Sequence, residues 1–337
     1  MVSKNNRLKT IAFIKNLSQE NSWLFDIGVV KRQLNKDKPR FLHFPVTKGG
    51  QQFFFKSCLY GRQDLKDNLS LELSIHRFLG LIDGAVGKII NWGKNDALGW
   101  YLREYFSLDQ GFVCEEEKIG DLKTKQVRKL GEVLLSLWQV KERAIPKSLC
   151  KRLLIQKKNV RTSQKLGKRV EEYLQMLSEA HQIKQLGWQI KTASTVRNYL
   201  RECKQTIDSF ENGRGIFVHG DLAPNNIFWG KEKIILFDWE WSCFNDNLFL
   251  GLGVDMANFF TRVWQRPELG TGLLSQVRRQ SLVDKKTFKK IIDLGLMFSV
   301  LQKIAPMFQH GYYKSDYDLE HFQVLVNILK KSISGSE

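Results

Sequence analysis

The stretch HGDLAPNNIFW, residues 219–229, decides the fold of this chain together with IILFDWEW at residues 234–241. Both stretches place acidic or amide side chains directly beside apolar, strand-like runs. An unpaired charge in such surroundings is costly, so these side chains need partners. We therefore expect Asp221, Asn226 and Asp238 to converge on one shared cleft.

The spacing of these three residues predicts a metal-dependent phosphoryl-transfer site. A strand that ends at His219 leads into a tight loop with Asp221 and Asn226, and a hairpin turning at residues 230–231 delivers Asp238 at its far end. An amide oxygen and a carboxylate, with no soft ligand nearby, suit Mg²⁺. Asp221 could accept the proton of a hydroxyl or orient it for attack. D-x-x-x-x-N followed by a hairpin ending in Asp is typical of kinases.

A kinase also requires a strand Lys for the nucleotide phosphates and a helix Glu beside it. Lys56 follows three phenylalanines in FFFKSC, and Glu72 lies in the helical pattern SLELSIHRFLGLI. A Lys in so apolar a strand needs a partner, and Glu72 is the candidate. The runs FLHFPV, QQFFFKSCLY, KIINW and GWYLREYF indicate strands, and the first hundred residues therefore predict a small sheet with one helix.

Helical periodicity dominates from about residue 123 onward, and strand patterns return only in GIFVHG, NIFWG and KIILFDW. We found no internal repeat and no low-complexity linker. The predicted fold class is α+β, with a bilobal arrangement. An N-lobe over residues 1–106 holds a small antiparallel sheet with one helix and binds the nucleotide, and a mostly helical C-lobe over residues 107–337 holds the catalytic loop and the metal and substrate sites.

The motifs resemble those of the aminoglycoside phosphotransferase and choline kinase superfamily, the small-molecule branch of the protein-kinase-like fold. HGDLAPNN is similar to that group's HGDxxPxN loop, FDWEW to its metal-binding IDWE segment, and GVDMANFF to a (F/Y)D(I/L)AxxF segment that choline kinases share. The detailed resemblance covers roughly residues 218–260. No GxGxxG phosphate loop is present, and TKGG is the nearest approach to one. The chain also has HGD where choline kinases typically carry HND.

This resemblance implies roles for individual residues. It makes Asp221 the catalytic Asp and Asn226 and Asp238 the Mg²⁺ ligands, while Lys56, positioned by Glu72, contacts the ATP phosphates. The backbone of Glu104 to Phe106 would meet the adenine at the hinge.

The resemblance also suggests supporting residues. His219 would hold the catalytic loop by hydrogen bonding, and Asp255 would brace that loop in preference to contacting substrate. Glu240 is open between a metal or substrate contact and a structural role. The aromatic side chains of this region could form a cage for a quaternary ammonium group, although core packing is the preferred explanation for them: Trp239, Trp241, Phe244 and Phe249.

Composition narrows the remaining possibilities. The formal net charge is +18, and residues 118–170 alone carry 16 basic and 3 acidic residues. A solvated helical face is the simplest explanation, and an anionic or lipid-linked substrate or a membrane surface is the alternative. Nucleic acid is disfavoured because no aromatics interleave with the basic residues. No signal peptide, membrane-spanning run or paired cysteine motif is visible, which predicts a cytoplasmic protein, with peripheral membrane contact left open.

We therefore expect an ATP- and Mg²⁺-dependent phosphotransferase that acts on a hydroxyl of a small metabolite. A sugar or sugar-containing precursor is preferred as acceptor, then a choline- or ethanolamine-type amino alcohol, then an antibiotic. GTP is not excluded as the donor. A pseudokinase binding module is the alternative from another class, and a protein kinase is disfavoured because no APE element follows DWE.

Overall fold

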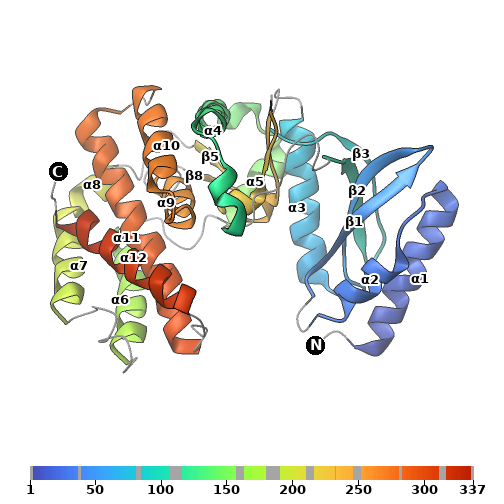
Figure 1. Ribbon diagram of the computed structural model, residues 1–337, viewed down its shortest axis with the longest axis horizontal. Helices are drawn as coiled ribbons and strands as arrows, with labels where there is room; N and C mark the ends of the chain where they lie inside the picture. The colour runs from blue at the N-terminus through green and yellow to red at the C-terminus, as the bar shows by residue number, and fades with distance from the viewer. Residues whose placement is uncertain are drawn as a thin grey trace. The chain divides into compact units, whose positions relative to one another are not determined.

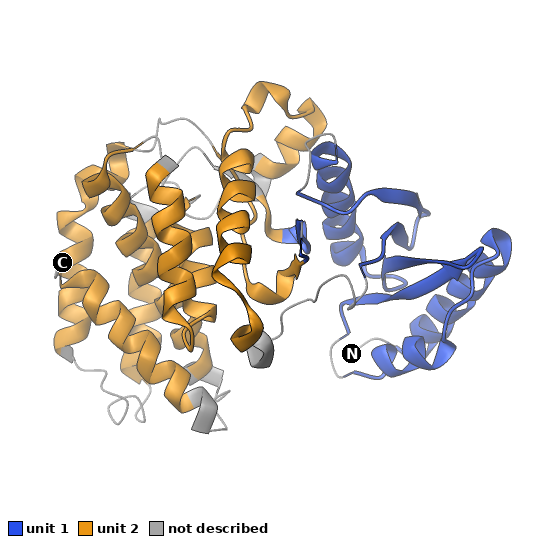
Figure 2. Ribbon diagram, turned by 45° about the horizontal axis from the view of Figure 1, so that its top comes forward, with its two compact units in different colours: residues 1–112, 230–240 blue, residues 113–229, 241–337 orange. Residues whose placement is uncertain are grey.

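The computed structural model describes residues 3–36, 39–80, 85–106, 116–156, 163–179, 190–209, 216–231, 233–245, 252–280, 283–310 and 316–334. It divides into two compact units: unit 1 comprises Met1–Phe112 and Gly230–Glu240, and unit 2 comprises Val113–Trp229 and Trp241–Glu337 (Figure 2). Within the described ranges, no helix has the length and apolar character needed to cross a bilayer. The expected lobe boundary after residue 106 adjoins residues outside those ranges, and the functional division into lobes stays a prediction.

Unit 1 is built on an antiparallel sheet in the order β1-β2-β4-β3 (Figure 1). Its strands are β1 (Phe41–Lys48), β2 (Gln51–Cys58), β3 (Ile89–Lys94) and β4 (Gly99–Glu104). The two-residue turn between β1 and β2 is Gly49-Gly50, and both glycines have positive φ, which a tight hairpin of this type requires. The four predicted strands are therefore confirmed, and the α3 helix (Gln63–Leu79) follows β2 as expected.

Two helices precede the sheet, and the expectation of strands with a single helix over the first hundred residues missed them. They are α1 (Lys4–Asn21), whose N-cap Ser3 accepts the backbone N–H of Asn6, and α2 (Ile27–Leu34), capped by Asp26. Their apolar residues share one core with β1, β2 and β4. Trp23, which follows α1, packs edge-on against Phe55 and Trp100 of the sheet.

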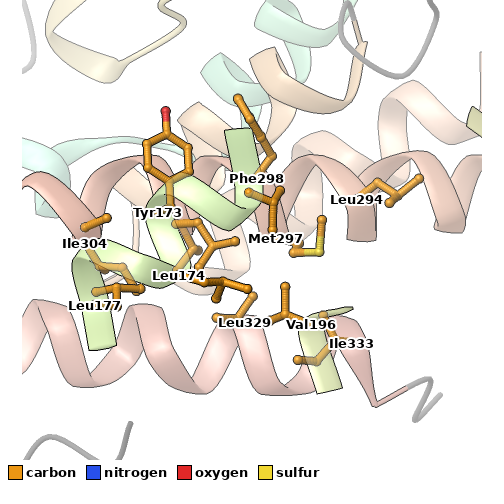
Figure 3. Close-up of a cluster of buried hydrophobic side chains, with 14 of the residues drawn as sticks. Tyr173, Leu174, Leu177, Val196, Leu294, Met297, Phe298, Ile304, Leu329 and Ile333 are labelled. Atoms are coloured by element: carbon orange, nitrogen blue, oxygen red, sulfur yellow. The ribbon is translucent and has the colours of Figure 1, made fainter. Parts of the chain in front are cut away.

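Unit 2 is mostly helical, as predicted. Its α-helices are α4 (Thr124–Trp138), α5 (Lys147–Gln156), α6 (Ser163–Glu179), α7 (Ile190–Glu202), α8 (Lys204–Ser209), α9 (Val254–Arg262), α10 (Pro267–Gln280), α11 (Lys285–His310) and α12 (Asp316–Ile333). The long α11 packs against α6, α9 and α12. Figure 3 shows a buried hydrophobic cluster between α6, α7, α11 and α12. These helices contribute, in that order, Tyr173, Val196, Phe298 and Leu329.

Short strands frame the predicted catalytic segment. They are β5 (Ile216–Val218), β6 (Ile227–Trp229), β7 (Ile234–Leu236) and β8 (Cys243–Asn245), with antiparallel pairing between β5 and β8. The predicted turn after β6 is present, because the backbone N–H of Gly230 donates to the carbonyl of Lys233. Fully buried residues surround the loop from β5 to β6, so its polar side chains sit on a rigid apolar base.

Candidate active site

A buried carboxylate fixes the loop that follows β5. Asp255, in the first turn of α9, accepts the backbone N–H of His219 through Oδ2 and that of Gly220 through Oδ1, each at 2.8 Å. Asp255 and His219 are both buried. The ring Nδ1 of His219 in turn accepts the backbone N–H of Asp221 at 3.3 Å. His219 and Asp255 therefore occupy positions from which they can hold the loop, as the sequence suggested.

The loop needs a glycine at position 220 because it passes close to the backbone of Trp241. The φ of Gly220 is +82°, and a Cβ at this position would overlap the carbonyl oxygen of Trp241. Ser242, which follows Trp241 in the chain, donates its hydroxyl to the carbonyl of His219 at 3.0 Å. The chain at 241–242 is thereby bound to the backbone directly before Asp221.

Asp221 and Asn226 contact each other inside unit 2. The Asn226 Nδ2 donates to the Asp221 carbonyl at 2.9 Å and to its Oδ2 at 3.1 Å. Asn226 belongs to a short 3₁₀ turn (Pro224–Asn226) that positions it directly before β6. These bonds hold the Asp221 carboxylate in one orientation, which a group that receives or directs a proton needs.

Burial changes the acidity of the bracing residue. The pKa of Asp255 is raised to about 7 because burial penalises the carboxylate, and the two backbone N–H bonds offset this only in part. Asp221 lies close enough to raise the pKa of Asp255 slightly further. The loop is thus held by a carboxyl group whose protonation changes near neutral pH.

Unit 1 carries a second polar network around Lys56. Lys56 Nζ donates to Glu72 Oε2 at 2.7 Å and to Asp238 Oδ1 at 2.9 Å, and Tyr101 donates its hydroxyl to Glu72 Oε1 at 3.0 Å. Lys56 and Tyr101 are direct partners in the β2–β4 register and therefore share one face of the sheet. The Lys56–Glu72 pair expected from the sequence is present.

Lys56 stays protonated despite its burial. Burial lowers the pKa of Lys56, but Glu72, Tyr101 and Asp238 raise it by more, and the net direction is upward. Burial and the adjacent Glu72 also raise the pKa of Tyr101, so its hydroxyl remains a hydrogen-bond donor at neutral pH.

The DWE segment is tied to the sheet at two points. Asp238 pairs with Lys56, and Glu240 Oε2 accepts from Arg40 Nη2 at 2.8 Å, with Glu240 buried and Arg40 half exposed. Asp238 has a φ of +59°, a left-handed conformation that is strained for a residue other than glycine. Strain of this kind is common at functional positions.

The predicted hinge residues also lie in unit 1. Glu104 ends β4, and its Oε2 accepts the backbone N–H of Lys88. The ring of Phe106 lies 4.7 Å from Lys233 Nζ and 6.1 Å from the ring of Phe237. The side chains of both predicted hinge residues therefore already contact other groups of unit 1.

Arg103 directly precedes this hinge and was not singled out from the sequence. Its guanidinium is buried between the rings of Phe54 at 4.1 Å and Phe237 at 4.3 Å, and it donates to the Glu104 carbonyl. The pKa of Arg103 is lowered by burial. A buried guanidinium packed between two aromatic rings thus adjoins the backbone expected to meet the nucleobase.

The residues available to a cation suit Mg²⁺. Asn226 uses its Nδ2 for Asp221, which leaves its amide oxygen as the atom suited to a hard cation, and Asp238 supplies a carboxylate. In the part of the chain that the structure describes, no three His, Cys, Asp or Glu side chains form a group that could hold a metal unaided. Each of the two residues offers the kind of oxygen ligand that Mg²⁺ prefers, and their joint role as its ligands stays a prediction.

Of the four aromatic side chains considered for a cage, two are described. Trp239 is fully buried and donates its Nε1 to the Leu236 carbonyl, which is a core position. Trp241 is 56% exposed and can meet a ligand. The side chains of Phe244 and Phe249 lie outside the described residues.

The predicted site residues thus form two groups. In unit 1, Lys56 contacts Glu72 and Asp238, and Glu240, Glu104 and Phe106 belong to the same unit. In unit 2, Asp221 contacts Asn226, His219 contacts Asp255, and Trp241 lies next to Gly220. The sequence did not single out Arg40, Tyr101, Arg103 or Ser242. The register of β4 against β2 is the signal that would have found Tyr101, and a single sequence does not give it.

The comparisons with known proteins agree with this geometry. Residues 121–266 match the family model described as choline/ethanolamine kinase. That range contains the loop from His219 to Asn226 as well as Asp238 and Asp255. This segment is therefore similar to choline/ethanolamine kinases, and it covers less than half of the chain. No curated protein sequence matches it significantly.

Solved structures of small-molecule kinases are similar in fold over most of the chain. The choline kinase LicA of Streptococcus pneumoniae is 17% identical, with 95% of this chain and 99% of that chain covered and a TM-score of 0.51. A spectinomycin phosphotransferase in complex with ADP and spectinomycin is 14% identical, with 88% and 90% covered and a TM-score of 0.55. An aminoglycoside phosphotransferase solved with streptomycin and ATP is 13% identical, with 91% and 99% covered and a TM-score of 0.51.

Proposed function

We propose that the chain transfers the γ-phosphate of Mg²⁺-bound ATP to the hydroxyl of a small amino alcohol of the choline and ethanolamine type. Lys56 binds the phosphates, Asn226 and Asp238 bind the Mg²⁺ ion, and Asp221 orients the acceptor hydroxyl and receives its proton. Mg²⁺ supplies charge neutralisation on the transferred phosphoryl group. Positioning and electrostatics then provide most of the rate enhancement.

The Asp221–Asn226 contact carries this proposal. The side chain of Asn226, an expected metal ligand, holds the carboxylate of Asp221 by a hydrogen bond. Phosphoryl transfer depends mainly on such fixed positions of the protein groups relative to one another. Gly220 and Ser242 add support by fixing the backbone on the N-terminal side of Asp221. Retention of all these contacts argues against a pseudokinase binding module.

Two observations favour an amino alcohol over the sugar that the sequence first suggested. The matching family model is that of choline/ethanolamine kinases. The backbone of Trp241 passes beside Gly220, one residue from Asp221, and its side chain is exposed, so that its indole is available to bind an ammonium group by a cation–π contact. A sugar offers no cation for such a contact.

The acceptor is tested by measuring ADP release with choline, ethanolamine, neutral sugars and aminoglycosides in parallel. We expect choline or ethanolamine to stimulate turnover above the rate without acceptor. Replacing Trp241 with Leu should raise the KM for the amino alcohol about tenfold, consistent with loss of a cation–π contact of roughly 1 to 2 kcal/mol, with little change in the KM for ATP. Stimulation by a neutral sugar alone would refute the amino alcohol and restore the sugar.

A further inference from the structure

Arg40 lies beside the Lys56 network, although it is far from Glu240 in sequence. Its guanidinium lies over the ring of Phe41 at 5.6 Å from the ring centre, and Lys56 Nζ lies over the same ring at 4.8 Å. The carboxylates that pair with the two cations, Asp238 and Glu240, are two residues apart. Two cation–carboxylate pairs therefore lie next to each other around one phenyl ring.

The positive charge of Lys56 already pairs with two carboxylates of the protein. It contacts both Glu72 and Asp238, so a single ammonium group serves two carboxylates before any phosphate arrives. A nucleoside triphosphate carries several negative charges, and kinases usually assist the Lys with a glycine-rich loop. The sequence of this chain contains no GxGxxG motif to provide that assistance.

The glycine turn of unit 1 cannot replace such a loop near Lys56. Gly49-Gly50 connects β1 to β2, and Lys56 lies six residues beyond Gly50 along β2. At about 3.3 Å per residue this places the turn roughly 20 Å from Lys56, too far for one triphosphate to contact both. Phe41 pairs with Cys58 at the end of the hairpin opposite the turn. Arg40 precedes Phe41 and therefore lies at the same end of the hairpin as Lys56.

We propose that Arg40 is a second phosphate-binding residue, which contacts the triphosphate beside Lys56 and takes over the task of the missing glycine-rich loop. A guanidinium presents a planar fork of N–H donors that matches phosphate oxygens. Among the described residues, Arg40 forms its hydrogen bond through Nη2 alone, and its half-exposed side chain leaves Nε and Nη1 for a ligand. This inference rests on the proposed function of the chain as an ATP-dependent kinase.

A purely structural role for Arg40 would consist of neutralising the buried Glu240. The two roles differ in what removal of Glu240 does. If Arg40 only compensates Glu240, loss of either partner disturbs the site in the same way. If Arg40 binds phosphate, loss of Glu240 releases a competing carboxylate and leaves phosphate affinity unchanged or higher.

The test is calorimetric binding of inorganic tripolyphosphate, ATP and adenosine to the full chain in the presence of EDTA, so that no metal and no turnover contribute. Arg40→Gln should weaken tripolyphosphate and ATP binding about tenfold or more, as expected for a lost charge-assisted hydrogen bond, and should leave adenosine binding unchanged. Arg40→Lys should recover part of the loss. Arg32→Gln is the matched control, because it removes the same charge from an exposed position on α2.

Three outcomes would overturn the inference. They are wild-type affinity for tripolyphosphate in Arg40→Gln, an equal loss in Arg32→Gln, or a loss in Glu240→Gln as large as that in Arg40→Gln. Thermal unfolding of each variant establishes that the fold is retained, and the partial recovery in Arg40→Lys separates charge from misfolding. If the wild-type chain binds neither tripolyphosphate nor ATP in EDTA but binds ATP with Mg²⁺, the inference fails and the proposed function stands. If it binds ATP under neither condition, both fail.

Discussion

The carboxylate of Asp255 accepts the backbone N–H of His219 at 2.8 Å, across 36 residues of sequence and within the buried interior of unit 2. The same carboxylate accepts the N–H of Gly220. The start of α9 is thereby joined to the loop that carries Asp221. The position of the expected catalytic group thus depends on a residue that we do not expect to touch substrate.

Replacing Asp255 with Asn should destabilise the chain and lower kcat. An amide has one acceptor oxygen, so one of the two backbone N–H groups would face an NH₂ group and stay unsatisfied. We expect a loss of about 1 to 3 kcal/mol in the free energy of unfolding at pH 7, measured by urea denaturation. An Asn variant as stable as the wild type would show that these hydrogen bonds contribute little.

The difference in stability between the wild type and Asp255→Asn should depend on pH. The pKa of Asp255 is about 7 in the folded chain and has its ordinary acidic value when unfolded, so between pH 4 and 7 the folded state holds a proton that the unfolded state has released. The contribution of Asp255 is therefore greatest at low pH and decreases as pH rises through 7. Urea unfolding of both proteins at pH 5, 6, 7 and 8 tests this. A difference that grows with pH would contradict the raised pKa.

Replacing Gly220 with Ala should disrupt the catalytic loop. The left-handed backbone alone costs a residue with a Cβ about 1 to 2 kcal/mol, and the overlap with the Trp241 carbonyl adds to that cost. Thermal unfolding should show a clear decrease in Tm together with loss of activity. Gly272→Ala is the matched control, because this glycine lies in α10 with open space around it, and the change should be neutral or stabilising by roughly 0.5 to 1 kcal/mol. Equal effects at both positions would argue against the close approach.

Replacing Lys56 with Met should cost both stability and nucleotide binding. It leaves Glu72 buried without its cation, which typically costs about 3 to 5 kcal/mol. Tyr101→Phe removes a single hydrogen bond to Glu72 and should cost about 2 kcal/mol. Urea denaturation of both variants checks that Lys56→Met loses more stability than Tyr101→Phe. If Tyr101→Phe proves the more damaging change, the ion pair is not the centre of the network.

The local sequence patterns predicted those parts of the fold that depend on local periodicity. The apolar run of three phenylalanines before Lys56 predicted β2, and the three- and four-residue spacing around Glu72 predicted α3. The ion pair between the two residues followed from these elements. The helices α1 and α2 were missed. In α1 polar residues lie between the apolar ones along most of its length, so its apolar face is weakly marked.

The contacts that complete the two groups of predicted site residues depend on long-range packing and have no local signal. Arg40 and Glu240 are 200 residues apart, and nothing near Arg40 indicates a buried partner. Tyr101 meets Glu72 because β4 pairs with β2 in a particular register, which strand patterns alone do not fix. The HGD and DWE segments were identifiable because each brings several functional side chains into a short stretch.

The most direct measurement is γ-phosphate transfer from ATP to an amino alcohol by the wild type and by Asp221→Asn, with ATP affinity measured on the same samples. Asn keeps the size of the side chain but cannot accept the hydroxyl proton. We predict that the wild type forms the phosphorylated alcohol, and that Asp221→Asn reduces kcat by at least about 100-fold with ATP affinity nearly unchanged. Wild-type activity in Asp221→Asn, or no transfer by the wild type to any alcohol acceptor, would contradict the account.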